Sequence, residues 1–308
     1  MGLMRSVLLW GSQNAWLRGQ MPQYAFVRRA VKRFMPGEHV DDALLAAEKL
    51  REDGLSTVLT QLGENISSAD EAEKVAAHYR EVLDKIRGRT LDCHISVKLT
   101  QLGLDLSAET CFNNLESIVK HAKTTGNFVW VDMEYSQYVN ATIDVFKRVR
   151  MKYDNVGLCV QAYLYRTAKD LEELLKIPAA IRLVKGAYAE PKEVAYSNKQ
   201  DVDDNYYAFV LHLLQHAQRN SIHSGIATHD KNILAKTQTA LSSMKLPKDA
   251  VEFQLLYGIQ RDEQLRLARD GYNTRVLISY GSFWFPWYMR RLAERPANVW
   301  FVVKHMFG

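Results

Sequence analysis

The sequence predicts an α/β protein folded as a (β/α)8 TIM-type barrel with additional N-terminal helices. Eight short runs of β-branched or apolar residues alternate along the chain with longer segments of helical periodicity, and no linker or low-complexity segment interrupts them. The 308 residues accommodate such a barrel, which needs about 250, together with an N-terminal arm. A doubly wound open sheet is the competing architecture, but the chain has neither a GxGxxG nor a Walker motif.

Local residue patterns place the individual elements. Ser67 or Ser68 opens a helix with acidic residues early and basic residues late, which matches the helix dipole, and Ser107 with Thr110 forms a partial capping box. The strands are predicted at 56–62, 93–99, 127–133, 156–163, 180–186, 223–229, 252–258 and 274–279. The helices are predicted at 68–88, 107–126, from Thr167 to before Pro178, 201–220, 230–244, 261–271 and 285–300.

Residues 1–40 are predicted to form a helical arm, and residues 41–308 the barrel domain that carries the functional site. The stretch from Ala15 to Met35 places five basic residues among aromatic and aliphatic ones. Two alternatives are open for it: a basic amphipathic helix on a membrane surface, or, more simply, a helix packed on the barrel with a solvated basic face.

The composition is that of an ordinary globular protein, with 47% apolar and 24% charged residues. The net charge of +5 is modest and the basic residues are spread, which argues against nucleic-acid binding. Cys93, Cys111 and Cys159 are too few and too scattered for a disulfide framework or a CxxC metal site. No apolar run approaches the roughly 20 residues that cross a membrane, and the start has no signal-peptide core. We therefore expect a cytoplasmic protein in a reducing compartment.

Polar side chains stand near the carboxyl end of most predicted strands, where barrels of this class carry their chemistry. They are Lys98, Asp132, Gln161, Arg182, Lys185, Tyr188, Thr228, His229, Asp230, Gln254 and Tyr257, and the last helix adds Arg290, Arg291 and Glu294. Cations outnumber carboxylates in this set, so the site suits an anionic ligand, and a pair of guanidinium groups binds a carboxylate or phosphate through bidentate bonds. His229 has no second histidine at ligand spacing, so no metal is expected. Without an obvious nucleophile, the site is typical of one that positions a cofactor, although Lys185 leaves Schiff-base chemistry open.

Six stretches in this order resemble the monofunctional bacterial proline dehydrogenases, which are flavoenzymes on a (β/α)8 barrel. The stretches are "ISVKLTQLGLD", "VQAYLYR", "RLVKGAY", "IATHD", "EFQLLYGI" and "MRRLAERPANV". The resemblance runs from about Arg33 to the C-terminus. It implies FAD across the carboxyl end of the barrel, hydride transfer from proline to give 1-pyrroline-5-carboxylate, and a membrane quinone as the electron acceptor.

The resemblance also implies roles for individual residues. Lys98, Arg290 and Arg291 match the residues that bind the substrate carboxylate, so the paired arginines would aim the amino acid at the flavin. Asp132 matches the catalytic aspartate that orders these cations, and Arg182 the catalytic cation beside the reactive flavin nitrogen. The implied flavin contacts are Met133, Gln161, Arg182, Lys185, Gly186, Ala187, Thr228, His229, Gln254, Leu255 and Tyr257. The further implied substrate contacts are Tyr188, Leu277 and Glu294.

One departure from the family pattern bears on the substrate. The family's last strand usually reads like "VYVPYG", whose first tyrosine packs on the substrate ring, whereas this chain reads "VLISYG". Leu277 replaces that tyrosine and Ser279 replaces the proline. The alternative substrate is therefore a substituted proline or another small cyclic amino acid. Two alternatives outside flavin chemistry are a Schiff-base barrel that uses Lys185 and a carboxylate-binding barrel without turnover.

Overall fold

The computed structural model confirms the predicted barrel. It describes residues 31–63, 66–220 and 224–294, together with residues 10, 11, 14, 16, 20, 21 and 24. Eight parallel strands pair in chain order, and the last closes on the first. The strands are β1 (Ser56–Gln61), β2 (Cys93–Val97), β3 (Val129–Val131), β4 (Val156–Gln161), β5 (Ala180–Val184), β6 (Ser224–Ala227), β7 (Glu252–Leu256) and β8 (Asn273–Tyr280).

Helices follow the strands, and the serine caps predicted for two of them, α5 and α6, are confirmed. The helices are α4 (Val40–Glu52), α5 (Ala69–Gly88), α6 (Ala108–Thr124), α7 (Val139–Arg150), α8 (Thr167–Leu174), α9 (Lys199–Asn220), α10 (Lys231–Ser243), α11 (Arg261–Arg269) and α12 (Trp284–Glu294). The short 3-10 helices are η2 (Thr100–Leu102), η3 (Ser136–Tyr138) and η4 (Lys248–Ala250). Ser68, Ser107 and Asp230 accept hydrogen bonds from backbone N–H groups of the first turns of α5, α6 and α10.

The structure corrects two details of the predicted elements. Most strands end earlier than expected, and the strand predicted at 127–133 shortens to β3, because the polar residues that follow it turn into the loop. Helix α7 was not predicted individually, since its β-branched residues weaken the helical signal.

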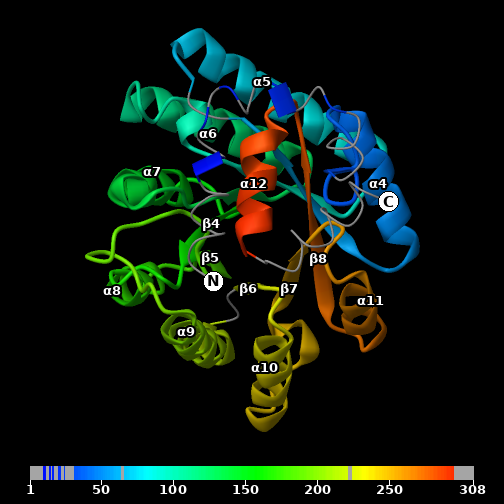
Figure 1. Cartoon of the computed structure of the whole chain (residues 1–308), viewed down its shortest axis with the longest axis vertical. Helices are drawn as coiled ribbons and strands as arrows, with labels where there is room; N and C mark the ends of the chain where they lie inside the picture. Colours follow the sequence, from blue (N-terminus) through cyan, green and yellow to red (C-terminus); the bar gives the residue numbers. More distant parts are fainter. Residues whose placement is uncertain are drawn as a thin grey trace.

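The last helix does not complete the ring around the barrel. Helix α4, which precedes β1, packs on both β1 and β8 and takes that place. Helix α12 instead lies over the middle of the ring, as Figure 1 shows, on the carboxyl side of the strands that it follows. The chain therefore brings its last helix, which carries Arg291, above the barrel mouth.

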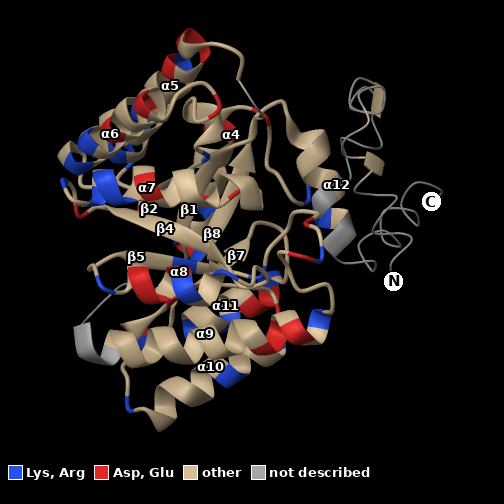
Figure 2. Ribbon diagram, turned by 90° about the vertical axis from the view of Figure 1, so that its left-hand side faces the viewer, with Lys and Arg blue, Asp and Glu red and all other residues tan. Residues whose placement is uncertain are grey.

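The main core lies between the barrel and the surrounding helices. Outward-facing strand residues such as Leu59, Val97 and Leu183 pack there against apolar faces of the helices. Lysine, arginine, aspartate and glutamate residues are spread along these surrounding helices, as Figure 2 shows. A smaller cluster inside the barrel contains Val58 and Trp130.

A second apolar cluster joins the segment before α4 to α12. Val31, Phe34 and Met35 pack with Trp284 and Tyr288, and the rings of Phe34 and Tyr288 lie 5.9 Å apart. This packing supports the simpler of the two alternatives for the end of the 15–35 stretch. The boundary at residue 40 stays a prediction, as does the fold of the arm residues that lie outside the described part.

Gly258 joins the same cluster to the barrel. It has φ +73°, and an added Cβ would lie 1.6 Å from the backbone oxygen of Arg33. We expect Gly258→Ala to lower the free energy of unfolding by about 2 kcal/mol or more, because backbone strain and a backbone clash add.

Chemical denaturation measures this loss, and Gly54→Ala is the matched control. Gly54 has φ +74° with nothing within 4 Å of the added Cβ, so it reports the backbone strain alone. Equal losses in the two variants would contradict the close approach of Arg33.

Within the part of the chain that the structure describes, no helix is long and apolar enough to cross a membrane.

Candidate active site

Three charged side chains meet at the carboxyl end of the barrel. Lys98 and Asp132 directly follow β2 and β3, whereas Arg182 lies within β5 and points into the barrel. Asp132 Oδ2 accepts a hydrogen bond from Lys98 Nζ at 3.1 Å, and Asp132 Oδ1 accepts one from Arg182 Nη1 at 3.1 Å. The structure thus brings one predicted carboxylate between two predicted cations.

The guanidinium of Arg182 is held on several sides. Its Nε donates to Gln254 Oε1 at 2.6 Å, and its Nη1 also donates to Ser96 Oγ at 2.8 Å. Its Cζ lies 4.5 Å from the centroid of the Trp130 ring, within the range of a cation–π contact. The side chain is only 3% exposed, so these contacts fix the plane of the guanidinium.

Ser96 and Trp130 were not found by sequence reasoning. Ser96 Oγ donates to Asp132 Oδ1 at 2.7 Å while it accepts from Arg182, so one hydroxyl orders both charged groups. The only signal in the sequence is alternation, because Ser96 and Trp130 occupy inward positions of β2 and β3.

Charge and burial set the protonation of this cluster. Burial alone raises the pKa of Asp132, but the charges of Lys98 and Arg182 outweigh it and hold that pKa below its ordinary value of 3.8. Burial lowers the pKa of Arg182 and Asp132 opposes this, and a guanidinium stays protonated in proteins. At neutral pH the cluster carries two positive charges against one negative charge, which suits an anionic ligand.

A second carboxylate, Glu134, fixes the loop that carries Lys98. Glu134 accepts hydrogen bonds from Thr100 N at 3.1 Å and from Thr100 Oγ1 at 2.7 Å. Burial raises the pKa of Glu134, and the bonds from Thr100 partly offset this. Because Thr100 lies two residues after Lys98, this contact holds the β2 loop against the β3 loop. Glu134 was also missed in the sequence.

Two buried polar atoms at the site have no hydrogen-bond partner within the described structure. They are Arg182 Nη2, a donor, and Gln161 Oε1, an acceptor. Gln161 is held by the bond from its Nε2 to Met133 O at 3.2 Å. A buried polar group without a partner destabilises the folded protein by about 1–3 kcal/mol. The free donor and the free acceptor therefore indicate a ligand that has both an acceptor and a donor group. The edge of a flavin ring has carbonyl and N–H groups, and the residues present therefore fit such a cofactor.

The loop after β5 passes close to Tyr163. Gly186 has φ +116°, and an added Cβ would lie 2.2 Å from the Tyr163 ring, so only glycine fits there. Gly186, a predicted flavin contact together with Ala187, therefore has only its backbone to offer to a ligand.

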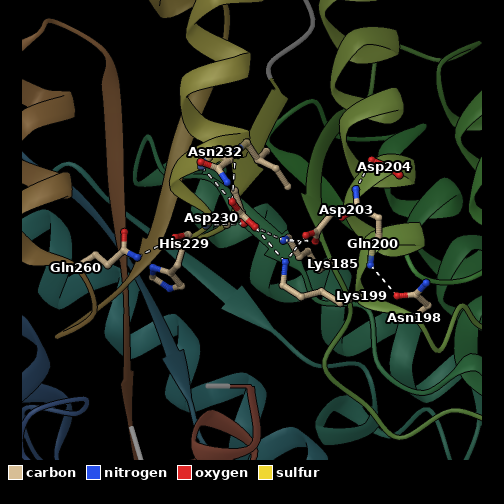
Figure 3. A network of polar contacts seen from close by, with 12 residues as sticks. Lys185, Asn198, Lys199, Gln200, Asp203, Asp204, His229, Asp230, Asn232 and Gln260 are labelled. Carbon is tan, nitrogen blue, oxygen red and sulfur yellow. Dashed lines mark hydrogen bonds and ion pairs between the residues drawn. The ribbon is translucent and has the colours of Figure 1, made fainter. Parts of the chain in front are cut away.

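Lys185 is engaged by two carboxylates in this structure. Its Nζ donates to Asp203 and, at 2.8 Å, to Asp230 Oδ2, and Lys199 shares both carboxylates, as Figure 3 shows. Lys185 is thus held as an ammonium group, and an ammonium group is no nucleophile.

Thr228 and His229 link the loops after β6 and β7. Thr228 Oγ1 accepts a hydrogen bond from Asp230 N at 3.1 Å. Leu256 N donates to His229 Nε2 at 3.2 Å, and Gln260 Nε2 donates to His229 O at 2.9 Å (Figure 3). A neutral His229 consequently carries its proton on Nδ1. In the described residues, no group of three or more His, Cys, Asp and Glu could hold a metal.

Tyr188 lies against Tyr135, with ring centroids 4.3 Å apart. Beside this pair, Glu190 accepts hydrogen bonds from Ser136 N at 2.7 Å and from Ser136 Oγ at 2.6 Å. These contacts fasten the loop after β5, with the predicted substrate contact Tyr188, to the loop after β3.

The remaining predicted site residues divide into three groups. Leu277 points into the barrel, where it packs against Val58 and Trp130, and Tyr257 N donates to its carbonyl oxygen at 2.9 Å. The side chain of Leu255 packs in the outer core, on the opposite face of β7 from Gln254, so its predicted cofactor contact could involve only its backbone. The side chains of Arg290 and Glu294 lie outside the described residues, although both belong to α12, as does Arg291.

Cys159 lies close to this charged cluster but is not expected to react. Burial raises the pKa of Cys159 to about 12, as it does for Cys93 and Cys111, and all three thiols are free and buried. We expect iodoacetamide at pH 8 to label none of them in the folded protein, because the thiolate is the nucleophile. Mass spectrometry tests this, with urea-unfolded protein as the fully labelled control. Labelling of Cys159 in the folded protein would show an accessible thiolate.

The closed barrel with a buried, cation-rich cluster at its carboxyl end has the architecture of a (β/α)8-barrel enzyme with a site suited to an anionic ligand. The family model described as Proline dehydrogenase matches residues 43–304. The chain belongs to the proline dehydrogenase family.

Individual relatives and solved structures agree with this assignment. The chain is 35% identical over 303 residues to Proline dehydrogenase 1 of Bacillus subtilis (strain 168), covering 98% of both chains. It is 36% identical over 280 residues to the Proline dehydrogenase of Deinococcus radiodurans, covering 89% of both. The structure of proline utilization A (PutA) from Bdellovibrio bacteriovorus inactivated by N-propargylglycine superposes with a TM-score of 0.82 at 24% identity, over 94% of this chain and 38% of that one. This last similarity shows the fold alone.

Proposed function

We propose that this protein binds FAD at the carboxyl end of its barrel and oxidises L-proline to 1-pyrroline-5-carboxylate. The proposal rests mainly on the buried cluster of Lys98, Asp132 and Arg182, with the unpaired Arg182 Nη2, in a chain of the proline dehydrogenase family. In this reaction a hydride leaves the carbon next to the ring nitrogen, the nitrogen loses a proton, and a C=N bond forms. FAD, when bound, supplies the hydride acceptor.

The residues of this chain bind and orient the reactants. We propose that Lys98, Arg290 and Arg291 hold the proline carboxylate, since Lys98 is aimed by Asp132 and by the Glu134 contact on its loop. Arg182 would hold a fixed positive charge for the bound cofactor, and such preorganised charge stabilises developing negative charge without reorganisation at the moment of reaction. Gln161, Gly186, Ala187, Thr228 and His229 are proposed to line the cofactor site, with Met133, Lys185, Gln254 and Tyr257 around them.

An anaerobic visible spectrum during titration with L-proline tests this function. The expected result is an oxidised flavin band that bleaches as proline is added. D-Proline provides a control for specific reduction. A protein without flavin, even after reconstitution with FAD, would refute the proposal. The Schiff-base alternative instead predicts a borohydride-trapped adduct on Lys185, which the two ion pairs of Lys185 argue against.

A second candidate substrate is a ring-substituted proline, and Leu277 is the observation that favours it. Leu277 lies on the inner face of β8 among apolar neighbours and offers neither a hydroxyl nor a ring to a substrate. We expect Leu277→Tyr to raise the preference, as a ratio of kcat/KM values, for proline over a ring-substituted proline about 10-fold, because one altered apolar contact is worth about 1–3 kcal/mol. Steady-state kinetics with both substrates measure this ratio, with Leu277→Ile as the size-matched control. An unchanged ratio would show that Leu277 does not line the substrate pocket.

We also propose a quinone as electron acceptor and a peripheral membrane contact by the N-terminal segment. The exposed Trp10 and Trp16 support this contact, since tryptophan favours the membrane interface. Reduction of a soluble quinone by proline-reduced enzyme and co-sedimentation with anionic lipid vesicles test the two parts separately.

A further inference from the structure

A column of buried polar side chains runs through the barrel beneath Arg182. Arg182 Nε donates to Gln254 Oε1 at 2.6 Å, and Gln254 Nε2 donates to Glu252 Oε1 at 2.7 Å. Arg275 Nε donates to Glu252 Oε2 at 2.8 Å. All four residues are at most 4% exposed. The column therefore continues from the site into the barrel interior by direct bonds.

The far end of the column is anchored at the opposite opening of the barrel. Arg275 Nη1 donates to Thr57 O at 2.7 Å and to Asp92 Oδ1 at 3.1 Å, and the Asp92 side chain is 64% exposed. Burying the Arg275–Glu252 pair carries a desolvation cost, and apolar residues of similar volume often stabilise a core equally well. The pair thus calls for a role other than stability.

The order of donors and acceptors along the column fixes one orientation of Gln254. Ionised Glu252 only accepts hydrogen bonds, so Gln254 must turn its Nε2 toward Glu252 and its Oε1 toward Arg182. With the amide reversed, Nε2 would face the Arg182 Nε–H, and two donors would oppose each other. Glu252 thereby determines that Arg182 Nε has an acceptor.

The neighbouring strand leaves room for this amide. Gly225 in β6 lies beside Gln254, and an added Cβ would lie 2.8 Å from Gln254 Nε2. The position of the amide is therefore sensitive both to the charge below it and to the backbone beside it.

We propose that Glu252 and Arg275 are positioning residues for the reaction, which act through Gln254 to hold the Arg182 guanidinium in its working orientation. The inference rests on the proposed function and adds residues that touch neither substrate nor cofactor. A purely structural role for the column would affect folding stability without changing the geometry of Arg182.

The chain permits a swap that reverses the effect of a single substitution. In Glu252→Gln, the new amide presents an acceptor to Arg275 and a donor to Gln254, so Gln254 has to reverse and Arg182 Nε loses its acceptor. In Gln254→Glu, two carboxylates meet. The double variant E252Q/Q254E restores acceptors for both arginines and keeps the net charge of the column.

We expect E252Q to lower kcat about 10–100-fold, because a small displacement of a catalytic group has an effect of this size. The midpoint potential of the bound flavin is expected to become more negative, and E252Q/Q254E to recover most of both losses. Glu263→Gln is the matched control: Glu263 is also buried and paired with an arginine, Arg266, but on α11.

A second measurement needs no cofactor and follows the Arg182 Nε–H signal by NMR. The signal is assigned by its loss in Arg182→Lys. We expect this Nε–H to resist hydrogen exchange in wild type and in the double variant, but to exchange readily in E252Q.

The outcomes separate this inference from the proposed function. Wild-type protein that ignores proline refutes the proposed function, and the NMR measurement still decides whether Glu252 positions Arg182. A folded E252Q with unchanged kcat, flavin potential and Nε–H exchange overturns the inference. So does a double variant that regains the melting temperature but none of these three quantities. If E252Q does not fold, Gly225→Ala displaces the same amide without changing charge, and unaltered kcat, potential and exchange there also overturn the inference.

Discussion

Asp132→Asn is expected to lower kcat/KM for L-proline about 100-fold or more, a loss typical of misplaced catalytic groups. The asparagine oxygen can still accept from Ser96 and Arg182, but its amide nitrogen then faces Lys98 Nζ, and two donors repel. Lys98 loses the carboxylate that orients its ammonium group, and the net charge of the site becomes more positive by one. Steady-state kinetics measure the loss, and Asp154→Asn, at an exposed ion pair with Lys123, is the control. A folded Asp132→Asn enzyme with wild-type kcat/KM would contradict the role of this carboxylate.

The lowered pKa of Asp132 also leads us to expect a pH-dependent contribution of this residue to the free energy of unfolding. Because Lys98 and Arg182 hold the folded-state pKa of Asp132 below 3.8, its contribution to stability is present above the unfolded pKa of about 3.9. That contribution is lost as the pH falls through the lower folded-state pKa. The difference in unfolding free energy between wild type and Asp132→Asn should therefore narrow on acidification. Its size is reduced by solvent screening, since the Asp132 side chain is 19% exposed.

The sequence predicted the barrel because its signals are repeated and local. Eight apolar runs and the serine caps at α5 and α6 each appear in the structure. The arrangement of α4 and α12 could not be predicted in this way. Both have a helical pattern, and only three-dimensional packing decides which one covers β1 and β8 and which one lies over the barrel mouth.

The charged residues of the site could be predicted from the sequence, but the residues that hold them in place could not. Lys98, Asp132 and Arg182 stand near strand ends, where charged residues in an apolar run attract notice. Ser96, which bonds Asp132 and Arg182, and Glu252, which reaches Arg182 only through Gln254, lie in strands as ordinary polar residues. A single sequence does not show which face of such a strand is directed inward. The same limit applies to Leu255, because a shift of one residue along β7 moves a side chain from the interior, where Gln254 lies, to the outer core.

Arg182→Met is expected to lower kcat about 100–1000-fold, the range observed when a preorganised electrostatic group is removed. Methionine fills the space on Trp130 but leaves Gln254 Oε1 without its donor and Asp132 with Lys98 as its remaining ion-pair partner. Rapid anaerobic mixing with proline measures the rate of flavin reduction directly, and the fraction of bound flavin shows whether the cofactor site survives.

Arg182→Lys distinguishes charge from geometry at the same position. A lysine ammonium restores the positive charge, yet it cannot donate to Gln254 and Ser96 in the fixed directions of a guanidinium or stack on Trp130 as a plane. We therefore expect its reduction rate to lie between those of wild type and Arg182→Met. A lysine variant as fast as wild type would mean that positive charge alone suffices, and the ordered column below Arg182 would then have no catalytic consequence.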